Sequence, residues 1–159
     1  MTVEPLIRDA VRAVILDRAD RVLLVHFSFP DREFWATPGG GIEPGETHSQ
    51  ALARELGEEV GEVDISRAVP VWTRTHLFEF PGGWDGQRDT YYLIRVDDLQ
   101  LRPRLDDEAL RSEGVTAAAW WTMPELDASR AHFSPTRLPE LVAVLLCDGA
   151  PELPVDVGE

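Results

Sequence analysis

The spacing of apolar residues predicts strands and helices in alternation along this 159-residue chain. Residues 9–17 alternate in polarity and are rich in Val, Ile and Ala, so we expect a strand there. Leu52, Leu56 and Val60 recur at four-residue spacing, which predicts a helix over 47–60 with one apolar stripe. The same reasoning predicts strands at 22–29, 68–80, 90–96 and 115–122, a short helix at 124–128 and a closing helix at 134–147.

The segments between these elements contain turn-forming and polar residues, and none has the composition of a linker between domains. We expect turns at 18–21 and 81–86, a loop at 30–34, an extended segment at 35–37 and a polar connection at 97–113. The chain has no internal repeat, and its length suits one domain. We therefore expect a single domain over 1–159, with its core at about 8–148 and a peripheral Pro-rich tail at 149–159. The order of elements is that of an α+β fold, with a mixed sheet between helices.

The first predicted helix carries three carboxylates on one side. At about 100° per residue, Glu58 and Glu59 lie about 60° and 40° to either side of Glu55. Carboxylates crowded in this way repel one another, and a hard cation such as Mg²⁺ or Mn²⁺ relieves the repulsion by binding their oxygens. The plain alternative is a solvated acidic face. Thr47 and Gly61 are suited to cap the two ends of the helix.

These residues resemble the signature of the Nudix family, G-x5-E-x7-R-E-U-x-E-E-x-G-U, in which U is aliphatic. The chain departs from it at the last position, where Glu62 stands and Val63 follows. The segments at 35–41 and 120–126 also look like parts of the family. The matching residues are Gly40, Glu46, Arg54, Glu55, Leu56, Glu58, Glu59 and Gly61.

The resemblance implies an α/β/α sandwich in which a loop–helix–loop motif holds Mg²⁺ (or Mn²⁺). Glu55, Glu58 and Glu59 would bind the metal, and we assign catalysis to Glu58 and Glu55. Glu46 and Arg54 look like the ion pair that orients the helix, although Arg54 could instead meet a substrate phosphate.

Residues outside the helix complete the expected site. The glycines Gly39, Gly40 and Gly41 allow the backbone to approach phosphates closely. Family members often add an acid from another loop. The candidates are Asp106, Asp107, Glu108 and Glu113, of which we favour Glu108 or Glu113 because they precede the strand at 115–122.

Four large side chains share one side of the strand expected at 68–80. Trp72, Arg74, His76 and Phe78 are two residues apart, so they face the same way. They could form a substrate wall, in which rings stack on a base and Arg74 or His76 reaches a phosphate or ribose. They could equally form a sheet face that packs on a helix.

Composition narrows the classes of partner. The net charge of −14 argues against binding to nucleic acid or anionic membranes. No apolar run is long enough to span a membrane, and the N-terminus lacks the features of a signal peptide. The single cysteine, Cys147, fits a reducing cytoplasm. Family members are often homodimers, which makes a homodimer an option here.

The function expected from these features is that of a metal-dependent pyrophosphohydrolase. The resemblance implies a substrate in which a nucleoside diphosphate, or another organic pyrophosphate, is linked to a further group. The alternative is a nucleotide-binding or sensor module on the same scaffold, but such modules lose acids that this chain keeps. Isopentenyl diphosphate isomerases share the fold and add a catalytic cysteine, which Cys147 matches poorly in position.

Overall fold

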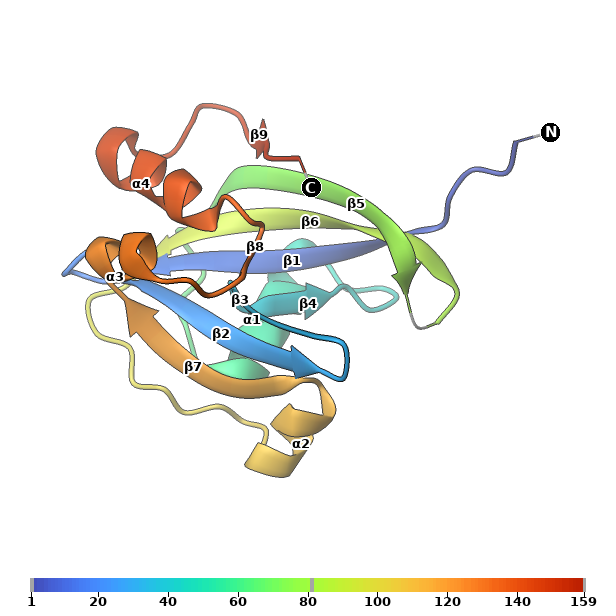
Figure 1. Ribbon diagram of the computed structural model, residues 1–159, viewed down its shortest axis with the longest axis horizontal. Coiled ribbons are helices and arrows are strands. Elements are labelled where there is room, and N and C mark those ends of the chain that lie inside the picture. The colour runs from blue at the N-terminus through green and yellow to red at the C-terminus, as the bar shows by residue number, and fades with distance from the viewer. Residues whose placement is uncertain (1, 81, 159) are drawn as a thin grey trace.

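The computed structural model describes residues 2–80 and 82–158 and contains one nine-stranded mixed sheet within them (Figure 1). The strands run in the order β8-β3-β2-β1-β6-β5-β9, with β4 paired to β1 and β7 paired to β2. The strands are β1 (Ile7–Leu16), β2 (Val22–Phe29), β3 (Arg32–Ala36), β4 (Gly39–Gly41), β5 (Val69–Phe80), β6 (Trp84–Arg95), β7 (Val115–Trp121), β8 (Phe133–Ser134) and β9 (Val155–Asp156). The helices are α1 (His48–Glu59), α2 (Asp107–Ser112), α3 (Met123–Ala128) and α4 (Leu138–Asp148).

Helices cover both faces of the sheet, so the expected α/β/α sandwich is confirmed (Figure 1). One core cluster joins α1 to alternate residues of β1 and β2, and the other joins α3 and α4 to the opposite faces of these strands and of β5 and β6. Neighbouring residues of a strand point to opposite faces. Trp120 accordingly packs against the first cluster and Trp121 against the second.

The sheet opens between its two central strands. β1 and β2 pair only at Leu16↔Val22, and from there they diverge. β4 takes the place beside β1, antiparallel to it at Ala10–Arg12, while β6 pairs with β1 in parallel along its full length. The divergence leaves room inside the sheet for the polar cavity described below.

The structure confirms the helices and strands predicted from strongly periodic segments. The predictions for polar segments agree less well with it. Thr47 caps α1 in a capping box with Gln50, as expected, but the C-cap is Val60, with Gly61 following at φ +134°. The expected polar connection at 97–113 contains α2, whose N-cap Asp106 accepts a hydrogen bond from the Ala109 N–H. β6 begins at Trp84 rather than at residue 90, because its first half also pairs with β1 and β5. The residues of this half are mostly polar and do not alternate with apolar ones, so the sequence pattern did not reveal the strand.

The C-terminal segments also differ from expectation. α4 begins at Leu138 instead of residue 134, because Phe133 and Ser134 pair with β3 as β8. The tail is not peripheral throughout: β9 pairs with β5, and Val157 is buried in the core cluster that contains α4. Among the described residues, no helix is long and apolar enough to cross a membrane.

Candidate active site

A cavity of about 710 Å³ lies where β1 and β2 separate. The diverging strands form its walls, the glycines of β4 form part of its rim, and the α1 acids reach it from one side. Its charged and polar lining residues are Arg8, Arg12, Asp31, Arg32, Glu33, Glu55, Glu59, Arg74, His76, Gln87, Asp89, Glu113, His132, Ser134 and Thr136.

Two of the predicted metal ligands, Glu55 and Glu59, are buried beside this cavity. Glu59 accepts a hydrogen bond from the Gly39 N–H at 3.1 Å. A Cβ at Gly40 would lie 2.6 Å from the Glu55 carboxyl carbon, so only glycine leaves space for this acid. Burial, followed by the charge of Glu55, raises the pKa of Glu59 to about 8, and burial also raises the pKa of Glu55. Burial therefore disfavours the charged form of both acids.

The third predicted ligand, Glu58, does not line the cavity and is more exposed than the other two. Its carboxylate lies 3.7 Å from an Arg54 nitrogen, while Glu55 accepts a hydrogen bond from the same nitrogen at 2.8 Å. Glu55 and Glu58 thus share one Arg54 nitrogen, whereas Glu59 contacts Gly39. In 2–80 and 82–158, no three His, Cys, Asp or Glu side chains are grouped so that they could hold a metal ion.

Arg54 and Glu46 form the predicted ion pair with two hydrogen bonds, Nε to Oε2 at 2.8 Å and Nη2 to Oε1 at 2.9 Å. Arg54 also donates to the Gly41 carbonyl at 2.9 Å. The hydrogen bonds from Arg54 lower the pKa of Glu46 to about 2. Arg54 thus joins the glycine strand, the loop and α1, and its donors face protein groups.

Of the four large side chains on one side of β5, three line the cavity, as a substrate wall would, and one packs in the core. Arg74, His76 and Phe78 line the cavity. Trp72 does not: it is only 3% exposed and packs on Tyr91, with ring centroids 5.4 Å apart. The prediction that Trp72 faces substrate is therefore wrong. The same sheet face is core where α4 covers it and cavity beyond the end of that helix.

A buried polar network on the cavity floor was not predicted. Asp89, 1% exposed, accepts from Arg12 Nε at 3.1 Å and from Gln87 Nε2 at 2.9 Å, and lies 3.4 Å from His76 Nε2. Burial would raise the pKa of Asp89, but Arg12 and His76 outweigh it and lower the pKa to about 2. Arg12 also donates to the Thr37 carbonyl at 3.0 Å, which connects this network to the glycine strand.

Of the two favoured extra acids, only Glu113 lines the cavity; Glu108 is exposed on α2. The turn after α2 brings Glu113 there, through the Glu113 N–H to Leu110 carbonyl bond. Arg88, near the β5–β6 hairpin, does not line the cavity and forms an exposed ion pair with Asp9 at 2.9 Å.

The fold recurs in known structures. The NUDIX domain of Shewanella oneidensis NrtR, solved with ADP ribose, superposes with a TM-score of 0.66 at 21% identity, over 91% of this chain and 90% of that chain. A MutT NUDIX hydrolase from Burkholderia pseudomallei gives 0.62 at 23% identity, over 83% and 94%. At these identities the likeness establishes the fold.

Sequence comparison establishes the family. The NUDIX domain model matches residues 6–141, so the chain belongs to the Nudix family. Nudix hydrolase 25 of Arabidopsis thaliana is 33% identical over 129 residues, 70% of each chain. The RNA pyrophosphohydrolase of Helicobacter pylori (strain G27) is 39% identical over 71 residues, 39% of this chain and 44% of that protein. The nucleoside triphosphatase NudI of Escherichia coli O1:K1 / APEC is 38% identical over 60 residues, 38% of this chain and 43% of that one. These last two matches span less than half of each relative.

Proposed function

We propose that this protein is a divalent-metal-dependent pyrophosphohydrolase that cleaves a nucleoside diphosphate linked to another group. The observation that carries the proposal is the position of Glu55 and Glu59, two buried acids that face a cavity lined elsewhere by arginines. Carboxylate oxygens are the ligands that Mg²⁺ and Mn²⁺ prefer. Burial, followed by the charge of Glu55, raises the pKa of Glu59, so the two carboxylates lie close enough together to share a cation. Glu55 and Glu59 would hold the metal, and Glu58 would become the third ligand through a side-chain rotation away from Arg54.

The bound metal would supply positive charge to the phosphates and lower the pKa of the attacking water. The chain's own groups would position the substrate and move the proton. The glycine strand, Gly39 to Gly41, lets phosphates approach its backbone, and Arg74 opposite is placed to bind a phosphate oxygen. A carboxylate of α1, Glu58 or Glu55, or Glu113 from the other side would accept the proton.

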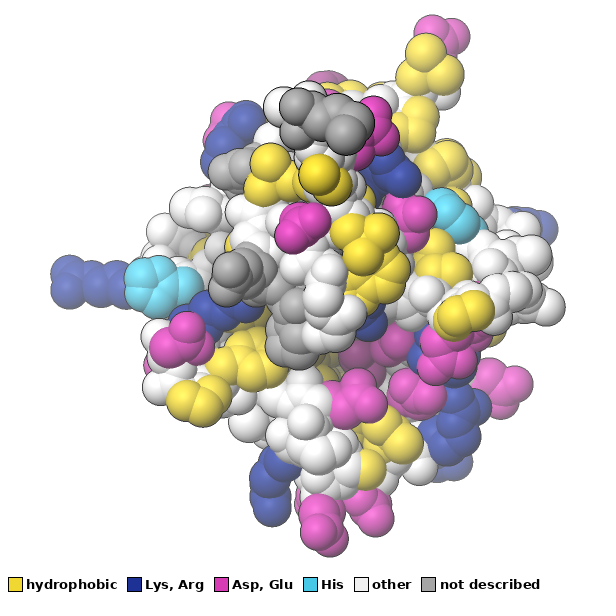
Figure 2. Space-filling model, turned by 90° about the vertical axis from the view of Figure 1, so that its right-hand side faces the viewer, with side chains coloured by type: hydrophobic (Ala, Val, Ile, Leu, Met, Phe, Trp, Pro, Cys, Tyr) yellow, Lys and Arg dark blue, Asp and Glu magenta, His cyan; other side chains and the backbone are white. Residues whose placement is uncertain are grey.

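We propose small nucleotides as substrates, in preference to nucleic acid. Figure 2 shows acidic side chains gathered on the lower part of the end from which the N-terminal segment projects. With the net charge of −14, this surface would repel a long polyanion. Because one relative is named a nucleoside triphosphatase, nucleoside triphosphates are the first compounds to test. A cytoplasmic location and a homodimer remain part of the proposal, on the family resemblance and the single cysteine.

The second candidate is a nucleotide-binding or sensor module, and one screen separates the two. Phosphate release would be measured over nucleoside triphosphates, nucleotide sugars, ADP-ribose and dinucleoside polyphosphates, with Mg²⁺ and with Mn²⁺. Glu58→Gln should lower turnover on the best substrate about 100-fold or more, because it removes a ligand charge without changing size. Glu62→Gln, an exposed change just beyond the same helix, should leave turnover unaltered. Tight nucleotide binding without release of product under either metal would favour the sensor module.

A further inference from the structure

The solvent-exposed side of the cavity contains an arginine among three phenylalanine rings. Arg32 begins β3 at the β2–β3 hairpin, and its guanidinium carbon lies 5.8 Å from the Phe29 ring centroid, 5.4 Å from Phe34 and 5.9 Å from Phe78. All four residues line the cavity. The planar guanidinium of Arg32 therefore lies among three aromatic rings.

The contact between Arg32 and Phe78 crosses the cavity. Phe29, Phe34 and Arg32 belong to β2 and β3, whereas Phe78 belongs to β5, and β1 and β6 lie between these strands in the sheet. The two sides of the site are thus carried by separate hairpins. A flat ligand that enters between the hairpins would meet rings on one side and the guanidinium on the other.

The rings are held in place although they are open to solvent. Phe29 is 38% exposed, and a Cβ at Gly114 would lie 2.5 Å from its ring, so the β7 end fixes one edge of this ring. Phe34 lies 6.2 Å from Phe29 and 5.5 Å from Phe27, which is buried. Aromatic rings fixed at an open cavity offer the stacking surface that binds nucleobases, at about 1–3 kcal/mol per base.

We infer that Arg32 and Phe78 form the two walls of a slot for the nucleobase of the substrate, which makes Arg32 a specificity-determining residue that selects base-bearing over base-free pyrophosphates. A base stacked on both sides needs about 7 Å, twice the carbon–carbon contact distance, so the guanidinium must move outward when the base enters. Its long exposed stem permits this movement, and its plane then covers the outer face of the base. The inference rests on the proposed function for the identity of the substrate, but the slot can be tested without turnover.

The test compares equilibrium binding of a nucleoside monophosphate and of ribose 5-phosphate, which differ only by the base, in the absence of metal. The wild-type protein should bind the nucleoside monophosphate at least about 10-fold more tightly. This preference should fall about 10-fold in Arg32→Ala and in Phe78→Leu, with little change for ribose 5-phosphate. Arg32→Lys keeps the charge and loses the plane, so it should not restore the preference.

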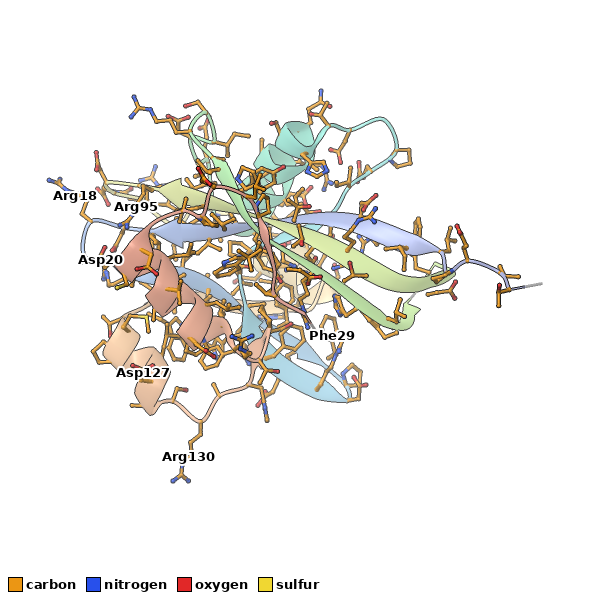
Figure 3. The ribbon with its side chains drawn as sticks, turned by 90° about the horizontal axis from the view of Figure 1, so that it is seen from above. Arg18, Asp20, Phe29, Arg95, Asp127 and Arg130 are labelled. Atoms are coloured by element: carbon orange, nitrogen blue, oxygen red, sulfur yellow. The ribbon has the colours of Figure 1, made fainter. Side chains whose placement is uncertain are left out.

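Arg130→Ala is the matched control, because Arg130 is exposed and points away from the molecule (Figure 3). It should leave both affinities unaltered, and melting curves should show that all variants are folded. Equal losses for both ligands would show that Arg32 binds phosphate, and tighter nucleotide binding by Arg32→Ala would show that it blocks the site; either result overturns the inference, as does an unchanged preference. A protein that shows the base preference yet hydrolyses nothing would refute the proposed function and leave the slot intact.

Discussion

Replacing Asp89 by Asn should destabilise the protein through the buried network on the cavity floor. The substitution keeps the size of the side chain and removes its charge, which leaves Arg12 without its carboxylate partner 3.1 Å away. The depression of the Asp89 pKa from 3.8 to about 2 corresponds to about 2–3 kcal/mol of stability. Removing one member of a buried ion pair costs about 3–5 kcal/mol. We therefore expect a loss of about 3 kcal/mol, or about 6–12 °C in melting temperature for a chain of this size.

The pH dependence of this loss follows from the direction of the shift. Because the pKa of Asp89 is lower in the folded state than in the unfolded chain, its stabilisation is fully present above about pH 4 and is lost as the pH falls towards 2. The difference between the wild-type protein and Asp89→Asn should therefore be constant between pH 5 and 8 and shrink below pH 4. Urea denaturation across this range measures it.

The same substitution at an exposed pair gives the control. Asp20 pairs with Arg95 at 3.0 Å, with side chains 64% and 52% exposed, and both lie at the left-hand end of the molecule in Figure 3. Asp20→Asn should change the free energy of unfolding by less than about 1 kcal/mol. Equal effects of the two substitutions, or a difference for Asp89→Asn that grows below pH 4, would refute the account of the buried network.

Three further substitutions test the remaining parts of the site. Arg54→Ala should lower both activity and the melting temperature, the latter by about 5 °C or more in thermal denaturation. The reason is that Arg54 donates hydrogen bonds to Glu46, Glu55 and the Gly41 carbonyl. Loss of activity alone would show that Arg54 binds a substrate phosphate instead. Arg74→Ala should raise the KM for the best substrate about 10-fold in steady-state kinetics, with a smaller effect on melting; a lower melting temperature with unchanged kinetics would make it structural. Saturating Mn²⁺ should raise the melting temperature of the wild-type protein by several degrees and that of Glu59→Gln much less; equal gains would place the metal elsewhere.

The predictions that succeeded depend on local geometry. The turns of α1, its Thr47 cap and the positions of Glu55 and Glu59 on one helix face follow from 3.6-residue periodicity, which tertiary contacts leave unchanged. The family pattern added the Glu46–Arg54 pair, whose two residues are eight apart along the chain. Such features are visible in a single sequence, because the interacting residues lie within one loop and one helix.

The features that were missed depend on contacts between distant strands. Arg12 and Asp89 are 77 residues apart, and only the parallel pairing of β1 with β6 brings them together. Trp72 shares its side of β5 with Arg74, yet α4 covers one and leaves the other beside the cavity. The available signal for the network was the acid Asp89, immediately before the strand predicted at 90–96, together with Arg8 and Arg12, which lie four residues apart on one side of β1.

Acids and arginines lie close together around the cavity, and their charges affect how it would bind a phosphate. Among the described residues that line it, four arginines face six carboxylates, so with neutral histidines and all six acids ionised the lining carries a formal net charge of −2. A lining with this charge would repel a polyphosphate, and the charge of Glu55 adds to burial in raising the pKa of Glu59. One divalent cation cancels that net charge, and a second would make the site positive. On the proposed function, the arginines beside the opening between β1 and β2 would therefore bind a phosphate tightly only with a metal at the wall that carries Glu55 and Glu59.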